Sequence, residues 1–174
     1  MAIYVYGDPQ DKNLRKFACD SLVGDGVSRF FWSYEDNFDL NILAVKASKG
    51  ELDSEEAEVF SKAKFLLEIK PDDYIVHVNV PVWGKVTVCK VVSGYYFQED
   101  LPEGHNDGRH CLKVNNVFVF DRDAPLVHTE ISKRLKLQGS HWQISYEYEK
   151  EFFASLSSLV LSLFDHLRET IRGF

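Results

Sequence analysis

The sequence has few cysteines, and its three thiols form no recognisable framework. Cys19, Cys89 and Cys111 are widely spaced, and none belongs to a Cys-x-x-Cys pair. A sparse, odd set of cysteines is typical of a reducing compartment rather than of a secreted, disulfide-linked domain. We therefore expect a cytoplasmic protein that is not stapled by disulfides.

Long apolar runs are missing as well. No stretch approaches the ~20 apolar residues that a membrane-spanning helix needs. The start, MAIYVYGDPQ, has neither the basic region nor the apolar run of a secretory signal. We expect no membrane partner. The length of 174 residues, with 45% hydrophobic and 27% charged residues, suits one folded domain.

Basic residues are outnumbered. The chain has 20 Lys and Arg against 27 Asp and Glu, which gives a net charge of -7. This balance opposes non-specific binding to nucleic acid, which depends on basic surfaces. Residues 71–146 are nearly neutral, however, with eight basic and nine acidic side chains and five of the six histidines. A local basic face in this segment remains open.

Motifs of common enzymes do not occur. The sequence contains no G-x-S-x-G, P-loop, H-E-x-x-H or dinucleotide-binding fingerprint. His105, His110 and Cys111 have the spacing His-x4-His-Cys, which matches no common zinc site. We therefore predict a protein without catalytic residues, metal or cofactor.

The hydrophobic pattern predicts an α+β fold. Apolar residues alternate or cluster as in β-strands, with turn residues between them, over residues 2–6, 28–33, 74–80, 85–93, 110–120 (one or two strands) and 142–146. Helical spacing occurs over residues 10–22, 39–48, 53–70 and 129–137. Short strands in this number suit a partly closed, mostly antiparallel β-barrel with flanking helices.

The strongest helical pattern covers residues 148–172. Its apolar residues recur every three or four positions: Phe152, Leu156, Leu159, Val160, Leu163, Leu167 and Ile171. We expect one domain over residues 1–147, followed by a C-terminal helix over 148–174. This helix is expected to cap the domain, to form a homodimer, or to lead into a further domain.

Residues 24–146 carry a family resemblance. Glu68-Ile69-Lys70 and the segment Gly84–Tyr96, with Gly26–Trp32 before them and Ile131–Ile144 after them, resemble the PUA-like superfamily, which includes EVE, YTH and ASCH domains. The chain looks closest to the N-terminal recognition domain of Mrr-type restriction endonucleases. It departs from the pattern at Asp72 and Lys90, where glycine is usual.

The resemblance implies recognition of DNA or RNA within a restriction or defence system, with cleavage by another nuclease domain or subunit. EVE and YTH domains hold an exposed base, methylated in some cases, between aromatic side chains. A base stacked on an aromatic ring gains about 1–3 kcal/mol, and polar groups then distinguish one base from another. The candidate base-binding residues are Trp32, Trp83, Tyr96, Tyr95, Asn79, Ser33 and Tyr34.

The same resemblance would bring Trp32, Trp83 and Tyr96 to one rim. A structural alternative is that Trp32 and Tyr96 fill the core, whereas Trp83, between Pro81 and Gly84, is harder to bury. Phosphate groups have candidate partners in the 98–113 segment and in the only tight basic cluster of the chain. These candidates are Arg109, Lys113, Lys133, Arg134 and Lys136.

Two other functions stay open at this point. A small nucleotide-like molecule in the same pocket would agree better with the net charge of -7 than a long polyanion does. An ASCH-like enzyme acting on RNA or a modified nucleoside would use residues such as Lys85, Thr87 and Glu99, although their spacing does not commit them to a reaction.

Overall fold

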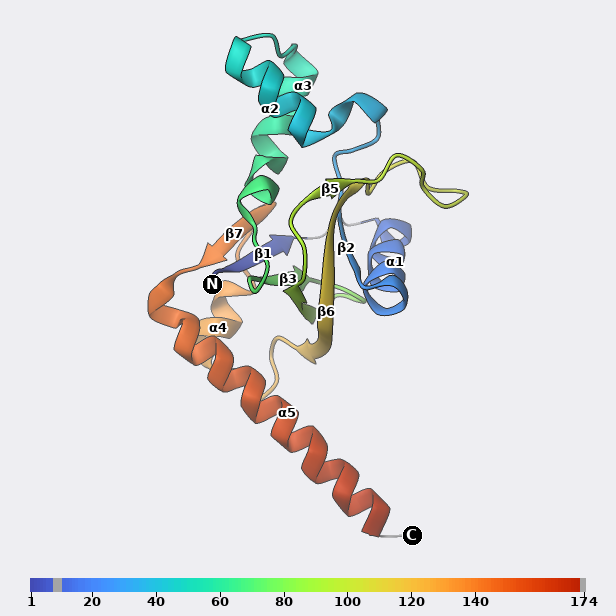
Figure 1. Cartoon of the computed structure of the whole chain (residues 1–174). Helices are drawn as coiled ribbons and strands as arrows, with labels where there is room; N and C mark the ends of the chain where they lie inside the picture. The colour runs from blue at the N-terminus through green and yellow to red at the C-terminus, as the bar shows by residue number, and fades with distance from the viewer. Residues whose placement is uncertain (8–10, 173–174) are drawn as a thin grey trace.

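The computed structural model describes residues 1–7 and 11–172. It is an α+β structure built on one seven-stranded sheet, which curls into an open half-barrel (Figure 1). The sheet order is β2-β6-β4-β3-β1-β7, and β5 adds to β6. The strands are β1 (Ile3–Gly7), β2 (Val27–Phe30), β3 (Tyr74–Val78), β4 (Lys85–Val91), β5 (Tyr96–Phe97), β6 (His110–Asp121) and β7 (His141–Ile144).

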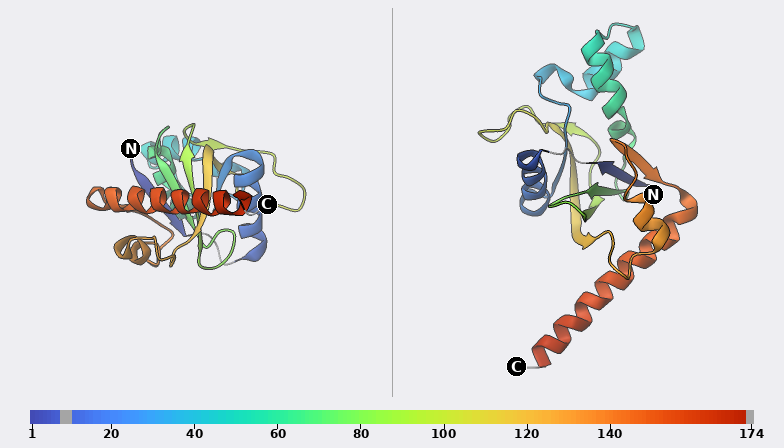
Figure 2. Two further views of the ribbon diagram at one scale, coloured as in Figure 1. Left: turned by 90° about the horizontal axis from the view of Figure 1, so that it is seen from below. Right: turned by 180° about the vertical axis from the view of Figure 1, so that it is seen from behind.

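Helices cover both faces of this sheet. They are α1 (Lys12–Asp20), α2 (Leu40–Lys49), α3 (Ser54–Ala63), α4 (Thr129–Arg134) and α5 (Glu149–Arg172). Short 3-10 turns occupy 36–38, 64–68 and 146–148, and a π turn follows α1 over 21–25. Helices α2 and α3 stand at one end of the molecule, and α5 projects from the other (Figures 1 and 2).

Most of the predicted elements are confirmed, with shifted ends. The helix expected over 10–22 begins at Lys12, because the Asp11 carboxylate caps the backbone N–H groups of Asn13 and Leu14. The helix expected over 129–137 ends at Arg134. The segment 110–120 forms a single strand, in which Asn116 has a positive φ of 51° and the pairing with β4 shifts register.

One pair of neighbouring strands is parallel. Strand β1 runs alongside β3, with Gly7 opposite Val78, whereas the other described pairs are antiparallel. The carboxyl ends of β1 and β3 therefore meet at one edge of the half-barrel. Gly7 donates its N–H to the carbonyl of Ser140 at 3.0 Å, which brings the loop before β7 to the same edge.

The sheet separates two hydrophobic cores. Helices α1, α2 and α3 contribute to the core on one face, and α4 and α5 to the core on the other. Regular alternation over residues 74–80 would place Val78 and Val80 on the same face of the sheet. In the structure, Val80 packs into the opposite core. The reason is Asn79, whose φ of 68° breaks the alternation between the two valines.

Helix α5 confirms the long C-terminal helix. Its first turns pack on the domain through Phe152, Phe153, Leu156 and Leu159. Farther along, Leu161, Leu163 and Phe164 are exposed. The expected pairing of this helix with a second copy of the chain stays a prediction.

The approach of β1 to the loop before β7 leaves no room for a side chain at position 7. A Cβ at Gly7 would lie 2.5 Å from the carbonyl oxygen of Gly139, which is backbone and has little freedom to move. Overpacking of this kind costs about 1–3 kcal/mol. Gly7→Ala should therefore lower the melting temperature by about 3–10 °C in a thermal scan.

The control is Gly94→Ala, because a Cβ at Gly94 would meet no atom within 4 Å. It should leave the melting temperature within about 2 °C of the wild type. Equal losses in the two variants would contradict the close contact at Gly7.

Candidate functional site

A large hollow lies where β1 and β3 end. This cavity has a volume of about 830 Å³. Its wall combines the strand ends, the turn between β3 and β4, the residue after β6, the loop after α4 and one residue of α1. It is lined by Gly7, Arg15, Val78, Asn79, Trp83, Arg122, Leu135, Lys136, Leu137, Gln138, Gly139 and Trp142. We call it the Trp83–Trp142 cavity.

The charges on this lining are all of one sign. Among the described lining residues, Arg15, Arg122 and Lys136 contribute cations, and none is an Asp or a Glu. The nearest balancing group in the described contacts is Asp123, which pairs with Lys136 and accepts a hydrogen bond from Ser132 at 3.1 Å. The hydrogen bond from Lys136 holds the pKa of Asp123 below its usual range. The cavity wall is therefore cationic in a chain that is acidic overall.

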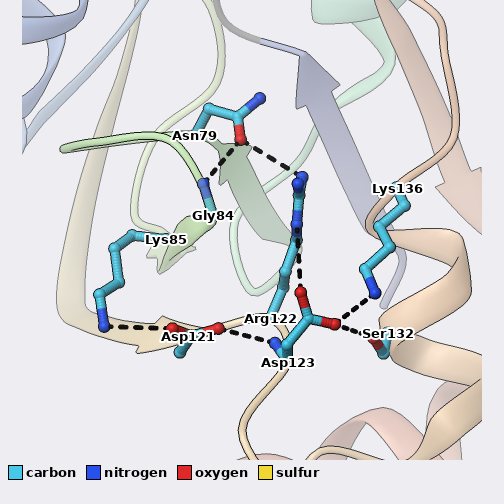
Figure 3. A network of polar contacts seen from close by, with 8 residues as sticks. All are labelled: Asn79, Gly84, Lys85, Asp121, Arg122, Asp123, Ser132 and Lys136. Carbon is cyan, nitrogen blue, oxygen red and sulfur yellow. Dashed lines mark hydrogen bonds and ion pairs between the residues drawn. The ribbon is translucent and has the colours of Figure 1, made fainter.

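Arg122 connects the parts of this wall (Figure 3). Its Nη1 donates to Asn79 Oδ1 at 3.3 Å, and its Nε lies 4.0 Å from Asp123 Oδ2. Only 12% of its side chain is exposed. Asn79 Oδ1 also accepts the backbone N–H of Gly84 at 3.1 Å, so the same oxygen holds the arginine and the turn between β3 and β4.

That turn presents Trp83 to solvent. The Trp83 side chain is 69% exposed, although a large apolar ring normally avoids such a position. The Arg122 guanidinium lies over the indole, 5.3 Å from the ring centre. This distance is within the range of a cation–π contact, and it orients Trp83 at the mouth of the cavity.

The lining includes nitrogen donors that are buried without a hydrogen-bond acceptor in the described part of the chain. These include Nε1 of Trp142 and Nε of Arg122. A buried N–H that makes no hydrogen bond costs about 1–3 kcal/mol. The cavity therefore offers donors to a ligand that carries hydrogen-bond acceptors.

A second, smaller hollow adjoins the cavity. It has a volume of about 340 Å³ and is lined by Lys12, Arg15, Pro81, Val82 and Trp83. We call it the Val82 groove. It shares Trp83 and Arg15 with the cavity but not Arg122. The groove thus meets the indole away from the guanidinium.

Trp32 lies in a different hollow. It lines a groove of about 380 Å³ together with Tyr34, Ser54, Glu55, Glu58, Val59 and Lys62. Its indole meets Tyr6 edge-on at 5.6 Å, and its φ is 77°. The described hollows therefore do not bring Trp32 and Trp83 to one rim, and the carboxylates beside Trp32 do not favour a phosphate there.

Ser33 and Tyr34, which follow Trp32, form hydrogen bonds within the protein. Ser33 is buried, and its N–H donates to Asp107 Oδ1 at 2.7 Å. Its hydroxyl donates to the same oxygen and accepts the N–H groups of Gly108 and Arg109. Tyr34 donates its hydroxyl to Glu55 at 2.7 Å. Both polar groups are occupied by the protein itself.

The two tyrosines of the predicted site are also structural. The Tyr95 hydroxyl accepts the backbone N–H of Leu40 at 3.1 Å and is hydrogen-bonded to His110 Nδ1 at 3.0 Å. Tyr96 belongs to β5 and pairs with Cys111. Burial raises the pKa of Tyr96 to about 12. Tyr96 is half-buried, and it belongs to neither hydrophobic core.

The five predicted phosphate-binding residues also do not lie together in one site. Arg109 donates to the backbone carbonyls of Ser33, Asn106 and Glu99, so it holds its own loop. Lys133 pairs with Glu130, and Arg134 lies over the ring of Tyr148 at 3.5 Å. Lys113 is exposed on β6. Lys136 alone of the five lines the Trp83–Trp142 cavity.

Sequence reasoning therefore found part of this cavity. It named Trp83, Asn79 and Lys136, which the structure brings together. It missed Arg15, Arg122 and Trp142. The motif Asp121-Arg122-Asp123 is typical of a turn, and Trp142 lies in a predicted strand, so neither residue indicates a binding site by its local sequence. The parallel pairing of β1 with β3, which gathers them, leaves no local signal.

The residues considered for an ASCH-like enzyme do not form a cluster. Lys85 pairs with Asp121 at 3.5 Å, and the buried Thr87 donates its hydroxyl to the carbonyl of Val80 at 2.8 Å. Glu99 is exposed in the loop after β5. In the part of the chain that the structure describes, no group of three His, Cys, Asp or Glu side chains is arranged to hold a metal ion.

Comparison with known protein families finds none that matches this chain, and comparison with curated proteins finds no matching sequence. Over residues 1–7 and 11–172, no helix combines the length and the apolar character needed to cross a membrane.

His110 provides a pH test of the packing beneath the tyrosines. Burial lowers the pKa of His110 to about 4, against about 6.5 in an unfolded chain. Between these values the unfolded chain binds a proton that the folded chain does not, so stability falls as the pH falls from 7 to 4. Thermal scans across this range should show a shallower decline for His110→Gln than for the wild type. Parallel declines would contradict the buried, neutral state of His110.

Proposed function

We propose that the protein is a non-catalytic nucleic-acid recognition module that binds a nucleotide unit at the Trp83–Trp142 cavity. The observation that carries the proposal is an exposed tryptophan beside a cavity whose described lining residues include three cations and no carboxylate. A nucleotide combines a flat base and an anion, so it matches both features of this surface.

The base stacks on Trp83 from the side of the Val82 groove. On the cavity side, the Arg122 guanidinium is 5.3 Å from the indole centre, which is too close for a base to fit between them. The Val82 groove lacks Arg122 and is walled by the apolar side chains of Pro81 and Val82. A base in this groove has the indole on one side and aliphatic surface on the other.

The phosphate lies toward the cations. Arg15 borders both hollows, whereas Arg122 and Lys136 line the cavity and not the groove. Phosphate contacts of this kind position a nucleic acid without specifying its sequence. The net charge of -7 then limits binding to this cationic surface.

The resemblance to PUA-like domains supports the same class of ligand, and within it a modified base, such as a methylated one, is the candidate to test first. It also supports a partner that cleaves the nucleic acid, either a nuclease domain or a subunit. The curled, mostly antiparallel sheet is compatible with a PUA-like fold.

Removing the stacking ring tests the proposal directly. Trp83→Ala should weaken binding of a short single-stranded oligonucleotide by about 5- to 100-fold, since stacking contributes about 1–3 kcal/mol per base. Trp83 is exposed, so the variant should keep its fold. Fluorescence titration with methylated and unmethylated oligonucleotides measures the effect.

The matched control is Tyr146→Ala, because Tyr146 is an aromatic side chain that is 87% exposed and lines none of the described hollows named above. It should bind as the wild type does. If the wild type binds no oligonucleotide at low salt, or if Trp83→Ala binds equally well, the proposal is wrong.

The salt dependence of affinity identifies the phosphate contacts. Log Kd against log salt should be steep for an oligonucleotide, and Lys136→Ala should reduce the slope by about 1. Lys49→Ala removes an exposed lysine at the end of α2 and should leave the slope unchanged. An affinity independent of salt would instead favour a neutral small molecule, an outcome consistent with the acidic composition.

A further inference from the structure

We propose that the site binds two successive nucleotides, with one base in the Val82 groove, the next in the Trp83–Trp142 cavity, and the connecting phosphodiester at Arg15. This inference rests on the proposed function and adds the size of the unit that is bound. Its starting point is that the two hollows have two lining residues in common, Trp83 and Arg15.

The shared residues are of the types that a dinucleotide step needs at its centre. In a nucleic acid, a phosphate joins two flat bases, so a protein that holds a step needs a cation between two stacking surfaces. Arg15 is a cation that borders both hollows. Trp83 offers its free face to the groove, and the cavity contains a second ring, Trp142. Lys12, in the groove, and Lys136, in the cavity, lie on either side of this centre.

The cavity is larger than a phosphate requires. Its volume of about 830 Å³ is in the range of pockets that hold drug-sized ligands. Besides the cations it contains the second tryptophan, Trp142, whose buried Nε1–H has no acceptor among the described residues. A phosphate alone would leave the cavity largely unfilled, whereas a base supplies a ring and hydrogen-bond acceptors.

The polar groups of the cavity agree with a base that presents acceptors. The Asn79 oxygen is already occupied by Gly84 and Arg122, which leaves its amide nitrogen as the group it can offer. Trp142 can only donate. Keto oxygens of a base, such as O4 of thymine, are acceptors, so they match these two donors.

The decisive comparison uses dTMP and the dinucleoside monophosphate d(TpT) with the full chain. One phosphodiester carries a single negative charge, whereas the phosphate of dTMP carries about -1.5 to -2 at pH 7. Charge alone would therefore favour dTMP. We expect d(TpT) to bind at least about tenfold more tightly in calorimetric or fluorescence titrations, because it occupies both hollows. The ribose analogues UMP and UpU distinguish RNA from DNA as the source of the step.

A conservative substitution tests whether the second base lies in the cavity. Trp142→Phe keeps an aromatic ring and removes the Nε1–H. It should weaken d(TpT) about threefold to tenfold, the effect of one lost hydrogen bond, and leave dTMP unchanged. Trp83→Ala should weaken both ligands. A thermal scan of each variant confirms that the fold is retained.

The possible failures are distinguishable. If dTMP and d(TpT) bind equally, or if Trp142→Phe changes neither, the two-nucleotide inference is overturned while the proposed function stands. If neither these ligands nor oligonucleotides bind, the proposed function itself is wrong.

Discussion

The contact of Arg122 with Asn79 and Asp123 is the interaction on which the cavity depends. These residues follow β6 and β3, two strands separated by β4 in the sheet. A guanidinium that is 12% exposed needs polar partners, because an isolated buried charge is strongly unfavourable. Its donors meet part of this need through Asn79 and Asp123, while Nε has no hydrogen-bond acceptor among the described residues. One side chain thereby fixes the β3–β4 turn, the start of the α4 segment and the orientation of Trp83.

The charge distribution gives the two ends of the half-barrel different chemical characters. The cavity at the ends of β1 and β3 has a cationic wall, whereas the groove beside Trp32 contains Glu55 and Glu58. An acidic protein can bind an anion when its basic groups are concentrated in a concave surface, where the local field exceeds that of the whole chain. The net charge alone would have hidden this separation.

The sequence predicted the fold class and most elements because these depend on local patterns. Helix α5, for example, has a strong apolar periodicity. Helix α3 is capped by Asp53 and has acidic residues in its first turn. The departures have specific physical causes. Val80 changes face because Asn79 adopts a left-handed conformation, and α4 is shorter than its apolar pattern.

The candidate site was less predictable, since it is assembled from distant segments. Trp83 could be named because an exposed turn is a poor place to bury an indole. Arg122 and Trp142 could not, because an arginine between two aspartates and a tryptophan in a strand both have ordinary local explanations. The parallel β1–β3 pair that gathers them is a long-range contact between residues about seventy positions apart.

The left-handed conformation of Asn79 links the interior of the protein to the wall of the Trp83–Trp142 cavity. One residue before it, Val78 packs into one core; one residue after it, Val80 packs into the other. Deleting or inserting a single residue here would rotate the amide away from Arg122 and reverse the destinations of both valines. The shape of the cavity wall and the packing of the two cores therefore depend on the same residue, whereas Gln138 and Val82 line the two hollows without belonging to either core.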